Sequence, residues 1–153
     1  MEPVIFCDYG NTISTFQDYT DKQNPLGSET LLLLDNLQEM QNNGALIFLA
    51  TDGSEADARY YHHRLKEKGY DFFADTITRE RLQTGYEVRK YYHSYWKKVE
   101  QRFNFNLNEI ILLDDDKDVL DNAMQNNITI VPSFPRQEAI YNLHALYQLK
   151  CEQ

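Results

Sequence analysis

The chain has 153 residues, a net charge of −9 and a hydrophobic content of 42%, which fits one globular domain over residues 1–153 with a single substantial core. A charge of this sign disfavours a nucleic acid as partner, because binding a phosphate backbone requires a basic surface. No apolar run approaches the roughly 20 residues that span a bilayer, and the N-terminus lacks the basic flank and cleavage site of a signal peptide. We therefore expect a cytoplasmic protein with no membrane partner.

Runs with the character of strands alternate with helical patterns along the whole chain. Short apolar runs predict strands at residues 3–7, 45–50, 72–77, 109–113 and 128–131. Apolar spacing and helix stop signals predict helices at residues 28–43, 54–68, 85–102, 117–125 and 135–149. Residues 9–27 are polar, and we expect a loop or a small flap there. The alternation predicts an α/β fold, a three-layer Rossmann-like parallel sheet with helices on both faces.

Polar residues follow three of the predicted strands. Asp8 follows the first, Thr51 follows the second, and an acidic run from Asp114 to Asp118 follows the fourth. Ligands of open parallel sheets bind beyond the carboxyl ends of the strands, so we expect these residues to share one site. A single aspartate in such a place often only caps a turn. Carboxylates crowded together repel one another without a cation, however, so the acidic run favours a metal site.

The order and spacing of these residues resemble the motifs of a known family. Asp8-x-x-x-Thr12 after the first strand, Thr51 after the second and Asp114-Asp115 after the fourth are similar to motifs of the haloacid dehalogenase-like superfamily. The resemblance covers residues 3–134 and rests on the set, because each motif alone is short. It implies a Mg²⁺-dependent phosphatase built on a haloacid dehalogenase-like core with a minimal cap or none.

Part of the chain resembles one subgroup more narrowly. The stretch from Arg79 to Lys90, followed by residues 110–115 and 130–134, looks most like the small-cap protein phosphatases that act on the RNA polymerase C-terminal tail. This resemblance implies an open site. The expected substrate is a phosphorylated protein, with phosphotyrosine as one form, or a small phosphate ester.

The resemblance also implies a role for each matching residue. Asp8 would be the nucleophile that forms an aspartyl phosphate, and Thr51 would bind a phosphoryl oxygen. The other residues near these two that would contact the substrate are Asn11, Thr12, Asp52 and Gly53. Mg²⁺ prefers oxygen ligands. Its expected protein ligands are Asp8, Asp114 and the backbone carbonyl of Gly10, and the metal site would also include Asp115 or Asp118 in the outer shell.

A cation is expected to neutralise charge on the phosphoryl group and on Asp8. Lys90 is the best match to the superfamily's lysine. Arg89 could substitute for it, although its planar guanidinium is a different donor. Arg79 and Arg81 are further alternatives. Lys90 could also be an ordinary solvated residue near the start of the long helix predicted at 85–102.

Gly10 departs from the superfamily's pattern. Phosphatases of that superfamily usually carry a second aspartate two residues after the first, which protonates the leaving group and later activates water. General acid–base catalysis contributes about 10²–10⁴-fold, so its absence should slow hydrolysis. A neighbouring group could take over this role, and the candidates besides the substrate itself are Tyr9, Asp18 and Asp52.

Two further accounts of Gly10 stay open. The substrate could carry a good leaving group, as an aryl or acyl phosphate does, or the protein could be a binding module that keeps the fold without turnover. A receiver-type phosphoacceptor is a weaker alternative. It would need an acidic pair after the first strand and the accepting aspartate after the third, whereas this chain places its acidic run late.

Overall fold

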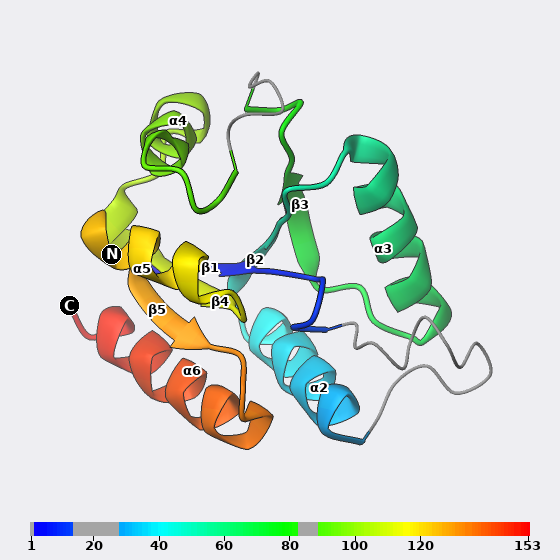
Figure 1. The fold of residues 1–153 in the computed structure, drawn as a ribbon. Helices are drawn as coiled ribbons and strands as arrows, with labels where there is room; N and C mark the ends of the chain where they lie inside the picture. The colour runs from blue at the N-terminus through cyan, green and yellow to red at the C-terminus, as the bar shows by residue number, and fades with distance from the viewer. Residues whose placement is uncertain (1, 14–27, 83–88) are drawn as a thin grey trace.

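The computed structural model describes residues 2–13, 28–82 and 89–153, and it contains one sheet of five parallel strands (Figure 1). The strands are β1 (Val4–Cys7), β2 (Leu46–Ala50), β3 (Phe73–Ile77), β4 (Ile110–Asp114) and β5 (Thr129–Pro132). The helices are α2 (Ser28–Asn42), α3 (Glu55–Glu67), α4 (Ser94–Phe103), α5 (Lys117–Gln125) and α6 (Arg136–Cys151), with a 3-10 turn η1 at Leu107–Glu109. The predicted three-layer α/β fold is confirmed.

The strand order β3-β2-β1-β4-β5 places β1 at the centre of the sheet. Val4 lies opposite Leu46 of β2 and opposite Ile110 of β4, and all pairings are parallel. The chain moves outward from β1 to β3 and then crosses to the other side of β1 for β4 and β5. The connections therefore change direction between β1 and β4, and the crevice at such a switch point is where open α/β sheets bind ligands.

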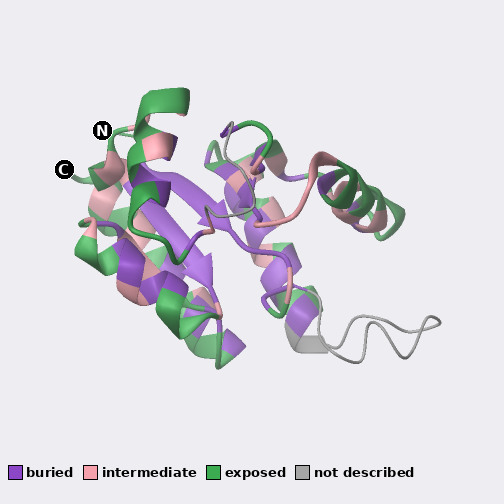
Figure 2. Ribbon diagram, turned by 45° about the horizontal axis from the view of Figure 1, so that its top comes forward, coloured by how far each residue is buried: buried purple, intermediate pink, exposed green. Residues whose placement is uncertain are grey.

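Side chains of successive residues alternate between the two faces of the sheet. In β1, Ile5 and Cys7 pack in a cluster with α2, α3 and α6, whereas Val4 and Phe6 pack in a second cluster with α4 and α5. Figure 2 shows the buried strands between these helices, whose outer surfaces are exposed. Because helices cover both faces, the strands read as continuous apolar runs in the sequence.

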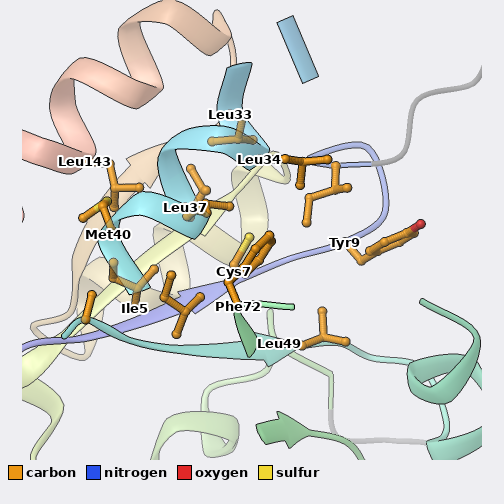
Figure 3. Packing of buried hydrophobic residues seen from close by; sticks show 14 of the residues in the cluster. Ile5, Cys7, Tyr9, Leu33, Leu34, Leu37, Met40, Leu49, Phe72 and Leu143 are labelled. Carbon is orange, nitrogen blue, oxygen red and sulfur yellow. The ribbon is translucent and has the colours of Figure 1, made fainter. Parts of the chain in front are cut away.

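The helix α2 illustrates how the apolar stripe binds a helix to the sheet. Leu33, Leu34 and Leu37 are fully buried, and Met40 is 6% exposed. Figure 3 shows these side chains on α2, together with Leu143 of α6. The sequence predicts an apolar stripe of Leu31, Leu34, Leu37 and Met40. The last three are buried, whereas Leu31 is 37% exposed and Leu33 is buried instead.

The helix predicted at 85–102 was placed too early. α4 begins at Ser94, residues 89–93 form a turn in front of it, and residues 83–88 lie outside the described ones. Lys90 is therefore in a turn and not in a helix. The reason is that side chains of Asp52 and Asn122 bind the backbone of Lys90, as described below.

Two other expectations reach beyond the described residues. The loop or small flap predicted at 9–27 falls largely on residues 14–27, which the structure does not describe, so the flap and the minimal cap stay predictions. The single domain over 1–153 also stays a prediction. Among the described helices, none combines the length and the apolar character that a membrane crossing needs.

Candidate active site

Asp8 and Asp114 lie side by side because their strands are neighbours. The backbone N–H of Asp8 donates to the carbonyl of Leu113 at 3.0 Å, which extends the pairing of β1 and β4 beyond Cys7. Both carboxylates are buried, with 9% of Asp8 and 1% of Asp114 exposed. Asp115 completes a group in which one carboxylate oxygen from each aspartate lies within 4.8 Å of the others. The predicted convergence of the strand ends is confirmed for these three residues.

Lys90 lies between the two buried carboxylates. Its Nζ atom donates to Asp8 Oδ1 at 2.8 Å, to Asp114 Oδ2 at 2.7 Å and to the carbonyl of Ala50 at 3.0 Å. Lys90 is 3% exposed, which is rare for a lysine without charged partners. It joins the three central strands of the sheet through a single ammonium group, and it is not a solvated surface residue.

The other predicted cations have different partners. Arg89 contacts the carbonyl of Asp52 at 3.4 Å. Arg81 pairs with Glu55 and Asp75 near the end of β3, and Arg79 lies 4.0 Å from Glu80. Of the four alternatives that the sequence left open, Lys90 is the one whose charged group contacts Asp8.

The pKa values of Asp8, Lys90 and Asp115 are all raised, by different combinations of burial and neighbouring charge. Burial raises the pKa of Asp8 to about 7, and the charge of Asp114 adds to this rise, while Lys90 opposes it. For Lys90, burial favours the neutral amine, but Asp8 and Asp114 outweigh it and hold the pKa well above the ordinary lysine value. Burial also raises the pKa of Asp115. A cation at this site would favour the charged carboxylates.

Thr12 supports Asp8 from a fully buried position. Its Oγ1 atom lies 3.3 Å from Asp8 Oδ2 and 3.2 Å from the Oγ of Ser133, within hydrogen-bonding distance of both. The guanidinium of Arg136 donates twice to the carbonyl of Thr12, at 3.3 and 2.9 Å. Thr12 thus orients the carboxylate of Asp8, and the substrate contact expected of Thr12 stays a prediction.

Sequence reasoning missed Ser133 and Arg136. Ser133 directly follows β5, and its backbone N–H donates to the carbonyl of Asp114 at 3.0 Å. It could have been found by the same rule that found Asp8, namely a polar residue at a strand's carboxyl end. Arg136 gives no such signal, because a buried arginine at the start of a helix looks like any surface arginine in the sequence.

The residues after β2 follow the strand that lies on the other side of β1 from β4. Thr51 is 7% exposed, and its Oγ1 atom accepts the N–H of Gly53 at 3.0 Å. A Cβ atom at Gly53 would lie 2.9 Å from Asp57 Oδ2 and 3.2 Å from Thr51 Oγ1, so a side chain there would displace the Asp57 carboxylate that helps to cap α3. Asp52 Oδ1 accepts the N–H of Lys90 at 2.9 Å. Phosphate binding by Thr51, Asp52 and Gly53 stays a prediction.

The loop after β1 contains the two remaining predicted residues. Asn11 is exposed and has a φ of 61°, in the left-handed region that asparagine tolerates. A Cβ atom built on Gly10 would meet nothing within 4 Å among the described residues, so a side chain has space there. The roles expected of the Gly10 carbonyl and of Asn11 stay predictions.

The acidic residues at the end of β4 and just after it have two different roles. Asp114 and Asp115 belong to the carboxylate group with Asp8. Asp116 instead caps α5, because its Oδ1 atom accepts the N–H groups of Asp118 and Val119 at 2.8 and 3.2 Å. The three grouped carboxylates supply the hard oxygen donors that a divalent cation such as Mg²⁺ prefers.

Comparisons with known proteins find similar folds, but they do not identify a family. No protein-family model matches the chain, and a search of curated proteins finds no match. An uncharacterized protein from Corynebacterium glutamicum has a similar structure, with a TM-score of 0.68 and 13% identity over 97% of this chain and 96% of that one. The UTR4 protein from Saccharomyces cerevisiae has a TM-score of 0.58 and 9% identity over 85% and 90%.

A third solved structure is also similar to this chain. The N-terminal part of BF1531 from Bacteroides fragilis, which contains a phosphatase domain complexed with Mg, has a TM-score of 0.67 and 15% identity to this chain. The match covers 96% of this chain and 40% of that one. At such identities these likenesses show a shared fold.

Proposed function

We propose that the protein is a Mg²⁺-dependent phosphatase of the haloacid dehalogenase-like type, with Asp8 as the nucleophile. The observation that carries this proposal is the contact of one buried ammonium, Lys90 Nζ, with Asp8 at 2.8 Å and Asp114 at 2.7 Å. A carboxylate can act as the covalent nucleophile in phosphoryl transfer. A cation and a metal ion held by carboxylates neutralise the charge that develops on the phosphoryl group. The likeness to a phosphatase domain complexed with Mg supports the same reading.

Phosphoryl transfer would proceed in two displacements at phosphorus. In the first, an oxygen of Asp8 bonds to phosphorus, and the bond from phosphorus to the leaving oxygen breaks with its electron pair on that oxygen. In the second, water bonds to phosphorus and the acyl phosphate bond breaks, which restores Asp8 and releases phosphate. Lys90 balances negative charge on the phosphoryl oxygens, and Thr51 would donate a hydrogen bond to one of them.

The metal would be held by the grouped carboxylates. Asp8, Asp114 and Asp115 would bind Mg²⁺ together with the carbonyl of Gly10. When bound, the ion would neutralise charge on the phosphoryl group. Lys90 already touches two of these carboxylates, so the ion would share them with the ammonium.

Gly10 limits the substrate, because it offers no proton to the leaving group. Of the side chains that could replace an acid there, Tyr9 is 3% exposed and stacks on Tyr61 with ring centroids 4.0 Å apart. Asp52 accepts a hydrogen bond from Lys90, and Asp18 lies outside the described residues. A substrate whose leaving group departs without a proton therefore suits this site. We propose an aryl phosphate, as in a phosphotyrosine protein or a small ester.

A direct assay tests this function. Purified protein is incubated with p-nitrophenyl phosphate and with a phosphotyrosine peptide, in Mg²⁺ and in chelator. The proposal expects hydrolysis in Mg²⁺ that chelator removes. Absence of hydrolysis, with Mg²⁺ binding retained in calorimetry, would contradict the phosphatase and favour a binding module.

Gly10→Asp is expected to speed hydrolysis of poor leaving groups. The position has space for the side chain, and a carboxyl there could donate a proton to an alkoxide. We expect kcat/KM for an alkyl phosphate to rise about 10²–10⁴-fold, with a smaller rise for p-nitrophenyl phosphate. Gly10→Asn is the matched control, since it has the same size without the acid. An equal gain in the asparagine variant would contradict the acid–base explanation.

Mg²⁺ affinity is expected to rise with pH up to about neutrality. Burial raises the pKa of Asp8 to about 7 in the metal-free site, so below this pH the carboxyl holds a proton that Mg²⁺ must displace. The dissociation constant should therefore increase about tenfold for each pH unit below 7. Titration calorimetry in buffers of different ionisation enthalpy measures both the affinity and the released proton. Affinity independent of pH over this range, with no proton released, would contradict the assignment of Asp8 as ligand.

A further inference from the structure

The backbone of Lys90 is held by side chains from two other elements. Its N–H donates to Asp52 Oδ1 at 2.9 Å, and its carbonyl accepts Asn122 Nδ2 at 2.9 Å. The same Asn122 amide donates to the carbonyl of Tyr92 at 2.8 Å. Both polar groups of the Lys90 backbone are thus bound in a turn, where no helical ladder would satisfy them.

Asn122 is suited to this role by its burial and its bonding. It is 6% exposed on α5, on the apolar face that also carries Val119 and Ala123. Its amide nitrogen donates to two carbonyls, and its Oδ1 atom lies 3.4 Å from the Nδ2 of Asn126. An apolar side chain of the same size would remove the hydrogen bonds to both carbonyls of the turn, and a buried carbonyl without a partner destabilises the turn.

The helix α5 connects this turn to the carboxylate group. At its N-terminal end, the N–H of Asp116 donates to Asp114 Oδ1 at 3.0 Å. Nearly two turns later, Asn122 binds the backbone of Lys90, whose ammonium returns to Asp114 Oδ2. The same helix therefore positions both Lys90 and Asp114. The N–H of Asp116 binds the carboxylate of Asp114, and the amide of Asn122 binds the backbone of Lys90.

We infer that Asn122 is a positioning residue that sets the place of the Lys90 ammonium between Asp8 and Asp114, with Asp52 holding the other side of the turn. The effect of this positioning on turnover rests on the proposed phosphatase function. Without the Asn122 amide, the turn at residues 89–93 loses its contact with α5, and the ammonium leaves its position for part of the time. A displacement of about 1 Å in a positioned group can lower a rate about 10²-fold.

The test uses a measurement that does not depend on activity. Wild type and Asn122→Ala are treated with trace acetic anhydride, and mass spectrometry gives the acetylation of Lys90 relative to the exposed Lys66. We expect relative labelling of Lys90 to rise on the order of tenfold in the variant, because protection of a buried group falls as the local structure opens. Where the wild type is an active phosphatase, kcat should fall about 10²-fold with KM nearly unchanged.

Controls separate positioning from general destabilisation. Gln125→Ala truncates an exposed side chain at the end of the same helix and should leave Lys90 protected. If Asn122→Ala does not fold, Asp52→Ala tests the other side of the turn from a partly exposed loop and should also raise Lys90 labelling. The inference is overturned if Lys90 stays protected from acetylation in folded Asn122→Ala and Asp52→Ala. It is also overturned if the wild type is active and Asn122→Ala has an unchanged kcat. A wild type without phosphatase activity contradicts the proposed function alone, because the labelling experiment still decides the positioning.

Discussion

Asp8→Asn should abolish turnover of p-nitrophenyl phosphate while the protein remains folded. Asparagine has nearly the same shape as aspartate, so the pairing of β1 with β4 and the hydrogen bond from Asp8 N–H to Leu113 should persist. The amide oxygen is a far weaker nucleophile than a carboxylate, and the acyl phosphate cannot form. Because loss of a covalent nucleophile removes the whole reaction path, we expect kcat to fall at least on the order of 10⁴-fold.

The measurement is steady-state hydrolysis in Mg²⁺, with circular dichroism to confirm folding. Asp71→Asn is the matched control, since Asp71 is an exposed carboxylate remote from the carboxylate group in the described structure. It should retain the wild-type rate. Metal-dependent hydrolysis by Asp8→Asn within a factor of about ten of the wild type would show that another group attacks phosphorus.

Lys90→Met should cost both stability and rate. Methionine keeps an apolar stem, but it leaves Asp8 and Asp114 facing each other without the ammonium that contacts both. Removing one partner of a buried ion pair destabilises a protein by about 3–5 kcal/mol. Loss of a positioned cation that stabilises the transition state should lower kcat about 10²–10³-fold.

The loss of stability in Lys90→Met should depend on pH. Without the lysine, the pKa of Asp8 rises beyond its already raised value of about 7, because the opposing influence of Lys90 is gone. The folded state then binds protons that the unfolded state has released, between the ordinary aspartate pKa and the raised one. The free energy of unfolding must therefore increase as the pH falls through this window.

Urea unfolding at about pH 5 and about pH 8 tests this dependence, and added Mg²⁺ should stabilise Lys90→Met more than the wild type. Lys97→Met, at an exposed position of α4, is the control and should behave like the wild type at both pH values. If Lys90→Met is as stable as the wild type at the higher pH, the lysine does not balance the two carboxylates.

The sequence was sufficient to predict the fold and the convergence of the acidic residues. Buried parallel strands appear as continuous apolar runs, and the residue after each run lies at the same edge of the sheet. Asp8 and Asp114 could be placed together by this rule alone, and the structure confirms it. The same rule applied to β5 would have added Ser133.

The turn at Lys90 could not be predicted in the same way. Its conformation depends on Asp52 and Asn122, which lie 38 and 32 residues away in the sequence. Local patterns favour a helix across this segment, and the distant hydrogen bonds override that preference. The signal that was available is Asn122 itself, because a polar residue among the apolar positions of α5 requires a buried partner.

The central claim, that Asp8 becomes phosphorylated, is tested most directly by rapid mixing with radiolabelled p-nitrophenyl phosphate and acid quenching. Gly10 provides no base for the second displacement, so the account predicts a burst of nitrophenol equal to the enzyme and label on the peptide that contains Asp8. Turnover in Mg²⁺ with label on a different residue, or with no burst and no label on Asp8, would contradict it.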